Sequence, residues 1–513
     1  MTDVGRPVIV VGGGPVGLTA ALLLARAGVP AVVCEAAPRR ETVGSRSICM
    51  QRDVLDVLDR CGRVGRMVAD AGVTWTTGRT YYREHEVLTI GFPDQPQAAF
   101  PPFTNLGQSI VERMLDDRVA AAPLVDMRWG ALVTGLDQDE DGVTVRLAGS
   151  GGGGGSGSGG ALRGSYCIAA DGAHSTVRGL LGLPFDGQSF SDQFLIADVR
   201  AALPFAAERR FFFDPEWNPG RQVLVHPQPD GVWRIDWQVP AEFDLAAEHA
   251  DGGLDARVRR VVDDLPYELV WVSAYRFHQR RVPRMLAGRV LLAGDAAHLM
   301  SPFGARGLNS GVQDAENAAW KIAYLLAGWG GPRLLDSYDD ERSAAAAQNL
   351  AITGETMRFL VPQTPAERAR RESVLARSVH DPAASAEINS GKLAEPYWYL
   401  GSPLTTPAPA EELAAFPTAP GLARPPLPGV LCPDAVLADG ARLRPLFGPQ
   451  FTVLAGGAAP PTPADGPPLR VLRADPVGLG EHGVALVRPD GHLAAVLPSP
   501  AALPATLHRA TGW

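Results

Sequence analysis

The sequence predicts an α/β protein in which a Rossmann-like unit is interrupted by an antiparallel β-sheet and followed by a smaller third unit. Three observations support this prediction. A glycine-rich turn stands between a buried strand and an apolar helix at the start of the chain, and a block of alternating strands fills its middle. The length of 513 residues is sufficient for two or three domains with substantial cores.

The amino-acid composition indicates which kinds of molecule the protein can bind. The chain is 46% apolar and 20% charged, with a net charge of −9, which is typical of a globular protein and disfavours nucleic-acid or anionic-membrane surfaces. The N-terminal apolar run lacks a preceding basic segment and is broken by glycines, so it is not a secretory signal. The five cysteines form no CxxC pair and no metal-ligand cluster with histidine, which favours a reduced, cytoplasmic setting without zinc. They are Cys34, Cys49, Cys61, Cys167 and Cys432.

The N-terminal turn has the spacing of a dinucleotide site. The strand-like PVIVV (residues 7–11) leads into GGGPVG, and a helix with an apolar face follows. Gly12, Gly14 and Gly17 then supply the tight turn, the close approach of a pyrophosphate and the packing of helix on strand. Glu35 ends the next strand, about 20 residues on, where a carboxylate can bind a ribose hydroxyl.

Two further motifs place polar groups at the ends of strands. Asp171 and Gly172 follow the strand-like SYCIAA, with Ser175 placed to cap a helix, and Asp295 follows RVLLAG. Ligands in α/β sheets bind at the carboxyl ends of strands. The later stretch GARGLNSG predicts a helix start near Gly307, whose free backbone N–H groups would face an anion.

In this order and at these separations, the three motifs resemble those of the FAD-dependent aromatic hydroxylases, the p-hydroxybenzoate hydroxylase-like flavoprotein monooxygenases. The C-terminal part resembles the thioredoxin-like tail of the phenol and 3-(3-hydroxyphenyl)propionate hydroxylases, but it lacks CxxC, so we expect a structural or interface role for it. The implied domains are a FAD-binding domain (residues 1–180 and 281–360), a β-sheet substrate domain (181–280), a helical connector (361–400) and a thioredoxin-like domain (401–513).

The resemblance also implies which residues hold FAD. The glycines would bind the pyrophosphate, Glu35 the adenosine ribose, and Asp295 the ribityl hydroxyls. The backbone N–H groups of Leu308 and Asn309 would face the pyrimidine edge of the flavin, where a helix N-terminus stabilises an anion by roughly 0.3–2 kcal/mol. The full implied set is Gly12, Gly14, Gly17, Glu35, Arg46, Gln108, Val133, Asp171, Asp295, Gly307, Leu308 and Asn309.

Candidate catalytic and substrate residues come from the β-rich block and the segment after Asp295. Arg306 would add positive charge beside the flavin, and the carbonyl of Pro302 would hold the substrate hydroxyl. His226 is the candidate base that removes the phenol proton, with a structural role beside the following proline as the alternative. Trp237 and Phe303, with His226 and Pro302, are the expected lining of the substrate pocket.

The activity implied by the resemblance is aromatic hydroxylation. NADH or NADPH would reduce the flavin, and molecular oxygen would form a flavin C4a-hydroperoxide that hydroxylates a phenolic substrate. The expected partners are that aromatic small molecule and oxygen, with no nucleic acid and no membrane, and a homodimer is an open alternative to the monomer. The identity of the substrate and the choice between NADH and NADPH stay open.

Two other functions compete with hydroxylation. A flavin-dependent halogenase needs an active-site lysine after the N-terminal motif, whereas Lys321 and Lys392 lie elsewhere. A flavoprotein that sequesters an aromatic ligand without turnover is the non-enzymatic alternative. Two features are assigned no chemistry: His298 is expected to be structural, and the glycine-serine run at 149–160 is expected to be a flexible hairpin tip.

Overall fold

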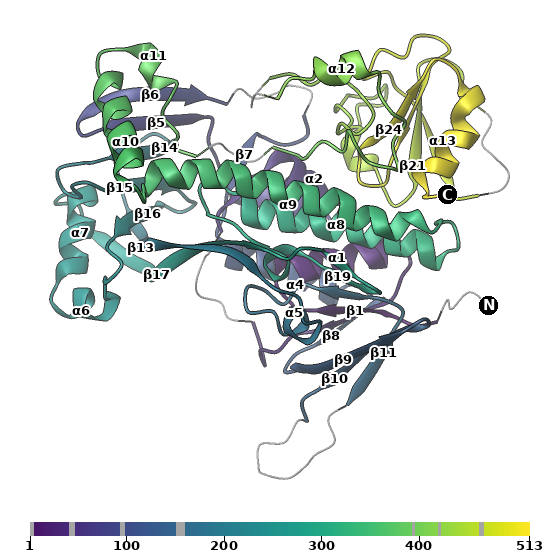
Figure 1. Cartoon of the computed structure of the whole chain (residues 1–513), viewed down its shortest axis with the longest axis horizontal. Helices are drawn as coiled ribbons and strands as arrows, with labels where there is room; N and C mark the ends of the chain where they lie inside the picture. The colour runs from purple at the N-terminus through teal and green to yellow at the C-terminus, as the bar shows by residue number, and fades with distance from the viewer. Residues whose placement is uncertain are drawn as a thin grey trace.

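The fold is mixed α/β, with helices packed between and against several sheets (Figure 1). The structure, a computed structural model, describes residues 5–40, 47–92, 98–149, 160–391, 395–418, 422–460 and 466–513. The tip of the glycine-serine run, residues 150–159, lies outside them, while its flanking strands pair antiparallel as a hairpin would.

A six-stranded sheet forms the core of the nucleotide-binding unit. Its strands β1, β2, β12 and β19 are short apolar runs that are buried on both faces, which is the pattern of a parallel sheet covered by helices. In the order β18-β19-β12-β1-β2-β8, all neighbours from β19 to β8 run parallel. The carboxyl ends of β1, β12 and β19 therefore lie side by side. The strands are β1 (Val8–Val11), β2 (Ala31–Cys34), β8 (Val125–Arg128), β12 (Cys167–Ala169), β18 (Leu286–Ala287) and β19 (Val290–Leu292).

Helices and two small sheets surround this core. α1 and α8 pack closely against each other, and α8 also packs against α9. The helices are α1 (Pro15–Arg26), α2 (Arg52–Arg60), α3 (Val64–Ala71), α4 (Gln108–Ala120), α5 (Thr176–Leu180), α8 (Arg306–Leu326) and α9 (Arg333–Leu360), with the short 3-10 turn η1 (Gly294–Ala296). The small sheets comprise β3 (Cys49–Gln51), β4 (Val73–Thr74) and β7 (Phe103–Asn105), and β9 (Val133–Asp139), β10 (Gly142–Leu147) and β11 (Ala161–Gly164).

An eight-stranded sheet forms the second unit, to the left in Figure 1. It has the order β20-β17-β13-β16-β15-β14-β5-β6, and only the β14–β5 pair is parallel. The last two strands at one end of the sheet, β5 and β6, come from the N-terminal segment, so the sheet extends beyond the predicted 181–280 block. The strands are β5 (Thr77–Tyr82), β6 (His85–Gly91), β13 (Asp186–Ala201), β14 (Arg209–Phe213), β15 (Gln222–Pro227), β16 (Val232–Val239), β17 (Tyr267–Arg281) and β20 (His298–Leu299).

Different helices cover the two faces of this sheet. Leu254 and Val258 of α7 pack with Trp237 on one face, and Val374 of α10 packs with Phe213 on the other. The segment predicted as a helical connector is thus part of the covering of the sheet. The helices are α6 (Leu245–Ala250), α7 (Gly253–Val262), α10 (Pro365–Ser378) and α11 (Pro382–Ser385).

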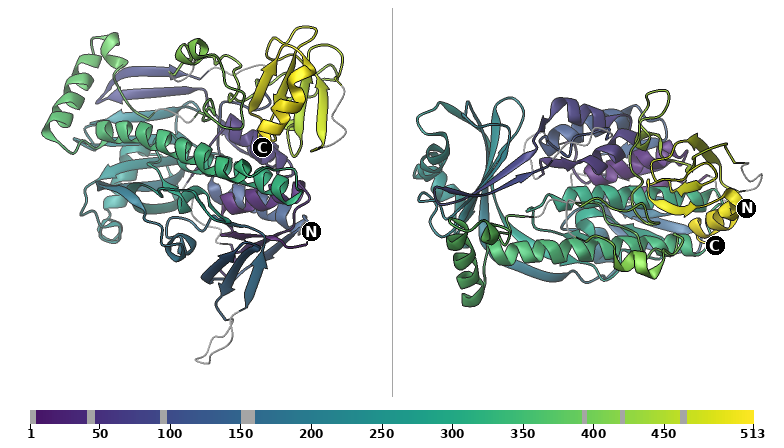
Figure 2. Two further views of the ribbon diagram at one scale, coloured as in Figure 1. Left: turned by 45° about the vertical axis from the view of Figure 1, so that its right-hand side comes forward. Right: turned by 90° about the horizontal axis from the view of Figure 1, so that it is seen from above.

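The C-terminal unit lies at the opposite end of the molecule from α10, as both views in Figure 2 show. Its four strands have the order β22-β21-β23-β24, with β21 and β22 parallel and the other pairs antiparallel. The predicted strand–turn–strand at the C-terminus is β23–β24. The elements are α12 (Ala410–Ala414), η2 (Arg444–Leu446), β21 (Phe451–Ala455), β22 (Leu469–Arg473), β23 (Val484–Val487), β24 (Leu493–Leu497), η3 (Pro500–Ala502) and α13 (Leu503–Ala510).

Two general features concern the described part of the chain. No helix there combines the length and the apolarity needed to cross a membrane. All five cysteines are buried with free thiols.

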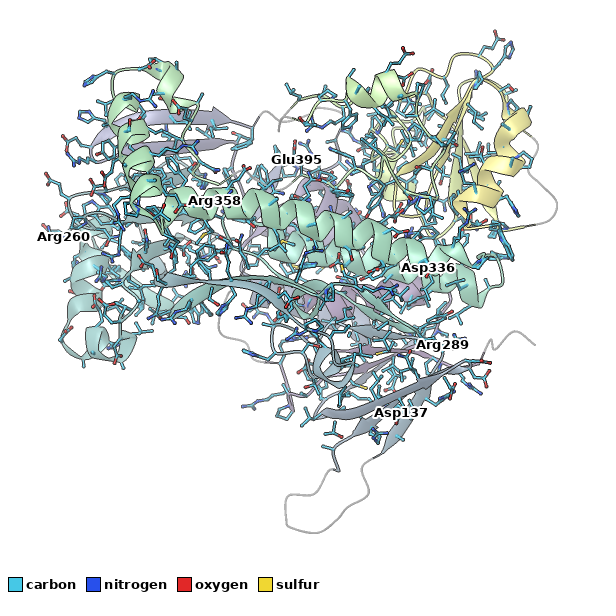
Figure 3. The ribbon with its side chains drawn as sticks, in the orientation of Figure 1. Asp137, Arg260, Arg289, Asp336, Arg358 and Glu395 are labelled. Atoms are coloured by element: carbon cyan, nitrogen blue, oxygen red, sulfur yellow. The ribbon has the colours of Figure 1, made fainter. Side chains whose placement is uncertain are left out.

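A buried ionic cluster joins the C-terminal unit to α9, whose ends are marked by Asp336 and Arg358 in Figure 3. Arg488, in the turn after β23, donates to both oxygens of Glu341 on α9, at 2.5 and 2.8 Å, and to Asp490 at 2.6 Å. Lys321 of α8 donates to Glu341 at 2.7 Å. These four side chains are at most 3% exposed, so the turn predicted from Pro-Asp-Gly is an interface.

We expect Arg488→Gln to destabilise the protein by about 3–5 kcal/mol, because it leaves the carboxylates of Glu341 and Asp490 buried without their main counter-charge. The measurement is the free energy of unfolding in urea. The control is Arg377→Gln, which removes a surface ion pair with Glu387 and should cost less than about 1 kcal/mol. Equal effects of the two substitutions would contradict a structural role for the buried cluster.

Candidate functional site

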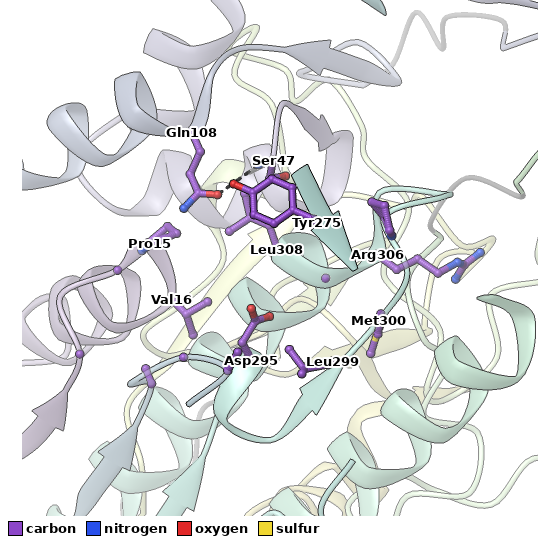
Figure 4. A pocket seen from close by; sticks show the side chains of 18 of the residues that line it. Pro15, Val16, Ser47, Gln108, Tyr275, Asp295, Leu299, Met300, Arg306 and Leu308 are labelled. Carbon is purple, nitrogen blue, oxygen red and sulfur yellow. Dashed lines mark hydrogen bonds between the residues drawn. The ribbon is translucent and has the colours of Figure 1, made fainter. Parts of the chain in front are cut away.

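One large cavity, of about 810 Å³, lies between the carboxyl edge of the six-stranded sheet and the inner face of the eight-stranded sheet. The turns after β1, β12 and β19 line one part of it, and β15, β16 and β17 line another. Figure 4 shows Asp295, Gln108, Tyr275 and Leu308 around it. The parallel strands therefore bring the three predicted motifs to one space.

The three predicted glycines meet different demands in the N-terminal turn. Gly12 has a φ of +104°, and a Cβ there would lie 2.3 Å from the carbonyl oxygen of Ala170. A Cβ on Gly17 would lie 2.0 Å from the carbonyl oxygen of Gly12, so this glycine lets α1 pack on the turn. Gly14 has no heavy atom within 4 Å of its would-be Cβ and lines the cavity. Only at Gly14 would a side chain project into free space.

Glu35 lies at the cavity wall and fixes the turn. Its carboxylate oxygens accept hydrogen bonds from the backbone N–H groups of Gly13 at 2.6 Å and Ala37 at 2.8 Å. The sequence analysis missed Arg40, which donates to the carbonyl of Gly13 at 2.7 Å and to Asp116 at 2.7 Å. No spacing rule connects Arg40 with Asp116, so this contact could be found only in three dimensions.

The other residues expected near the pyrophosphate lie along the same wall. Gln108, at the start of α4, accepts a hydrogen bond from Ser47 N–H at 3.2 Å (Figure 4). It also donates to Glu112 at 2.9 Å. Val133, at the start of β9, also lines the cavity. Arg46 lies outside the described residues.

Both carboxylate oxygens of Asp171 accept hydrogen bonds from neighbouring residues of the turn. Asp171 accepts hydrogen bonds from Ser175 Oγ at 2.5 Å and from Val177 N–H at 3.1 Å, which orders the start of α5. Ser175 caps this helix, as predicted, by accepting from Arg178 N–H at 3.0 Å. Arg178 also donates to the carbonyl of Ala296 and so ties the Asp-Gly turn to the Gly-Asp turn.

Asp295 is exposed to the cavity among buried neighbours, and a second aspartate positions its turn. Asp314 of α8 accepts hydrogen bonds from Gly294 N–H at 2.9 Å, His298 Nε2 at 2.7 Å and Arg342 Nε at 2.6 Å. Burial alone would raise the pKa of Asp314, but the charge of Arg342 and the bonds from His298 and Gly294 lower it to about 2. His298 thus has the structural role that its sequence context predicted.

The segment after Pro302 ends in a strained turn at the start of α8. Ala305 has a φ of +55°, a left-handed conformation that costs a non-glycine residue about 1–2 kcal/mol. No side chain caps the helix. Gly307 and Leu308 line the cavity, while the side chain of Asn309 binds Gln51 N–H and the carbonyls of Cys49 and Ala305.

Arg306 is the first residue of α8, and its guanidinium is held by a neighbouring helix. It donates to Asn349 of α9 at 2.6 Å and points away from Asp295 in Figure 4. Burial lowers the pKa of Arg306 to about 10, so it carries a positive charge at neutral pH.

Comparison with known proteins identifies the family. The family model described as FAD binding domain matches residues 6–353, which cover every motif at this cavity. The chain belongs to this FAD-binding family. A flavin-dependent monooxygenase of Mycobacteroides abscessus is 29% identical over 96% of this chain and 97% of its own length.

A second relative and a solved structure extend the comparison. The 3-(3-hydroxy-phenyl)propionate/3-hydroxycinnamic acid hydroxylase of Mycobacterium avium is 31% identical over 70% of this chain, and the match spans 62% of that relative. The crystal structure of the flavin-dependent monooxygenase PieE in complex with FAD and substrate superposes with a TM-score of 0.81. It is 26% identical, and the match covers all of both chains.

The geometry of the described residues fits FAD. The open space at Gly14 is the one place in the turn where a pyrophosphate can approach backbone N–H groups. Asp295 lines the same cavity as Glu35 and Leu308, and no acidic side chain stands in the first turn of α8. An anionic flavin edge would therefore meet N–H dipoles without a competing negative charge.

The expected substrate residues do not all reach the cavity. His226, Pro302 and Phe303 line the cavity. Trp237 does not, and its prediction was wrong: it is 1% exposed and packs with Leu195 on the other face. Successive strand residues point to opposite faces, so the neighbour Asp236 takes the cavity position that we assigned to Trp237.

Burial and the charges of Arg209 and Arg234 lower the pKa of His226 well below its ordinary value. His226 is therefore neutral but weakly basic at neutral pH. The sequence analysis did not find three further polar side chains in this wall, Arg209, Arg234 and Asp236.

We expect two glycine substitutions in the N-terminal turn to fail in different ways. Gly14→Val should change the free energy of unfolding of the FAD-free protein by less than about 0.5 kcal/mol, yet abolish FAD binding because the side chain fills the approach of the pyrophosphate. Gly17→Ala should destabilise the FAD-free protein by about 1–3 kcal/mol through overpacking. Urea unfolding and flavin-fluorescence titration measure the two effects, and normal FAD affinity in Gly14→Val would refute the assignment.

Proposed function

We propose that this protein is an FAD-dependent monooxygenase that hydroxylates a phenolic substrate, with NADH or NADPH as reductant and molecular oxygen as co-substrate. One observation carries the proposal: a single cavity runs from the glycine turn and Glu35, past Asp295, to a polar patch on the eight-stranded sheet. A dinucleotide and an aromatic ring can therefore share one enclosed space. The names of the relatives support the reaction class.

In this proposal, four residues of the cavity wall position the cofactor. Asp295 would accept hydrogen bonds from ribityl hydroxyls, Gly14 would leave room for the pyrophosphate, and Leu308 N–H would donate to the pyrimidine edge. Arg306 adds positive charge at that edge from behind the turn. When bound, FAD supplies the redox chemistry that takes electrons from NADH or NADPH and one oxygen atom from molecular oxygen.

The residues near the ring exclude water and orient the substrate. Phe303 is 4% exposed and packs edge-on against Phe194, with ring centroids 5.2 Å apart. The carbonyl of Pro302 can accept a hydrogen bond from the substrate hydroxyl, and His226 can hold the same group as a neutral hydrogen-bond partner. A halogenase is disfavoured because it needs an active-site lysine after the N-terminal motif, whereas Lys321 is buried in its ion pair with Glu341 and Lys392 lies far along the sequence from that motif.

We expect purified protein with bound FAD to oxidise NADH or NADPH about tenfold faster, or more, when a suitable phenol is present, which corresponds to about 1.4 kcal/mol of barrier. The assay uses a panel from single-ring to polycyclic phenols, and mass spectrometry should find one added oxygen atom in the product. The matched control for each phenol is the same ring without its hydroxyl. Bound FAD and bound ligand without stimulated oxidation would instead support the sequestering flavoprotein.

A further inference from the structure

The cavity wall formed by the eight-stranded sheet carries a row of polar side chains from adjacent strands. His226 on β15 pairs with Arg234 on β16, and Arg234 pairs in turn with Asp198 on β13. Asp236 is two residues further along β16 and lies on the same face as Arg234. Arg209 lines the same cavity from β14.

The positive charge of Arg234 is balanced by the carboxylate of Asp198. The Nε and Nη2 atoms of Arg234 each donate to a different oxygen of Asp198 at 2.9 Å, and both side chains are at most 5% exposed. This paired guanidinium is a structural part of the sheet, and Arg209 and Asp236 are the charged groups of the patch that remain.

Arg209 and Asp236 lack ionic partners in the part of the chain that the structure describes. Arg209 donates to the backbone carbonyl of Ser390, and no carboxylate lies within ion-pair distance of it. The side chain of Asp236 forms no hydrogen bond with the described residues, and its Oδ1 is buried without a partner. Buried charges are usually paired with an opposite charge, so the guanidinium of Arg209 and the carboxyl group of Asp236, which have no ionic partner among the described residues, indicate a ligand that binds to this wall.

The surroundings of Asp236 set its protonation. Burial raises its pKa to about 7, against the opposing charges of Arg234 and Arg209 and with a further upward contribution from Asp198. From the other strands, His226 on β15 and Tyr275, Arg276 and His278 on β17 face the same cavity, as does Cys49 on β3. A carboxylate in this setting can accept a proton near neutral pH, whereas His226 is held in its neutral, weakly basic form.

We propose that Asp236 removes the proton of the substrate's phenolic hydroxyl and that Arg209 stabilises the phenolate that results. The O–H bond breaks, the proton moves to the Asp236 carboxylate, and the electron pair stays on the phenolic oxygen. The net charge of the cavity is unchanged by the transfer, because the negative charge moves from Asp236 to the substrate. The inference rests on the proposed function and assigns the base to Asp236 in place of His226.

The proposal narrows the substrate class. A neutral phenol brings the proton that the Asp236 carboxylate can take, and its phenolate brings the negative charge that Arg209 lacks. A ring without a free hydroxyl would leave both groups unpaired and should bind poorly.

The test compares two phenols with different acidity on the FAD-loaded protein. 4-Methylphenol is almost wholly protonated at neutral pH and needs a base, whereas 4-nitrophenol is a much stronger acid and is largely ionised in mildly alkaline solution. Asp236→Asn should slow hydroxylation of 4-methylphenol by about 100-fold and that of 4-nitrophenol less than about tenfold. Asp186→Asn, an exposed aspartate on β13, is the matched control and should leave both rates unchanged.

The pH profile gives a readout that a structural role would not move. With 4-methylphenol, kcat/KM of the wild-type protein should rise as the pH increases through about 7, because the ionised carboxylate is the active form. This limb should be absent in Asp236→Asn. The variant should fold, because it removes a buried carboxylate whose raised pKa makes its ionised form destabilising at neutral and alkaline pH. Arg209→Gln provides a second variant and should weaken binding of the 4-nitrophenolate ion by about tenfold or more, with Arg209→Lys restoring part of it.

Equal losses for the two phenols in Asp236→Asn, or a retained pH limb, would overturn the inference while leaving the proposed function in place. A wild-type protein that contains FAD but shows no oxidation stimulated by any phenol would contradict the proposed function, and the inference with it.

Discussion

The site depends on one buried carboxylate, Asp314. Three donors from different parts of the chain converge on it, and one of them is the backbone N–H of Gly294, which immediately precedes the cavity-facing Asp295. Breaking such a buried ion pair with Arg342 costs about 3–5 kcal/mol. With a pKa of about 2 against an ordinary 3.8, the ionised Asp314 stabilises the fold at neutral pH, and this contribution is lost as the pH falls from about 4 towards 2.

A series of buried ion pairs and hydrogen bonds connects Asp314 to the C-terminal unit, which has no dithiol. Arg342 donates to Tyr399 Oη at 2.9 Å, Asn317 bridges Tyr399 and Glu341, and Glu341 binds Arg488 of the C-terminal unit. Buried contacts therefore run without a break from the last sheet to the turn that carries Asp295. These contacts hold the C-terminal unit against α8 and α9, and none of them involves a cysteine.

Local signals in the sequence were sufficient to predict the turns that come together at the cavity. The glycine turn, the Asp-Gly turn and the Gly-Asp turn each combine a strand with the residues that follow it, and parallel strands bring such turns to one edge regardless of the rest of the fold. The predicted start of α8 near Gly307 is one residue from the observed start at Arg306. The partners that hold these turns, Arg40 and Asp314, act across long sequence separations and have no local signature.

The substrate half was harder to predict for a physical reason. The alternation in VWRIDWQVP shows that β16 has two different faces, but the phase does not tell which face meets the cavity, and a shift of one residue exchanges all the side chains. We placed the aromatic Trp237 towards the ligand, whereas α7 covers that face and the charged residues Arg234 and Asp236 face the cavity. The pairing of β5 with β14, which is more than 100 residues away in the sequence, adds β5 and β6 to the sheet. No local sequence pattern predicts this pairing.

A crystal structure of the protein with FAD and a bound phenol tests the account most directly. We predict that the dinucleotide lies along the wall from Glu35 past Asp295 to Leu308, with the phenol against β15 and β16 and its oxygen within hydrogen-bond distance of both Arg209 and Asp236. A flavin bound outside this cavity, or a ring that leaves Arg209 and Asp236 unpaired, would contradict it.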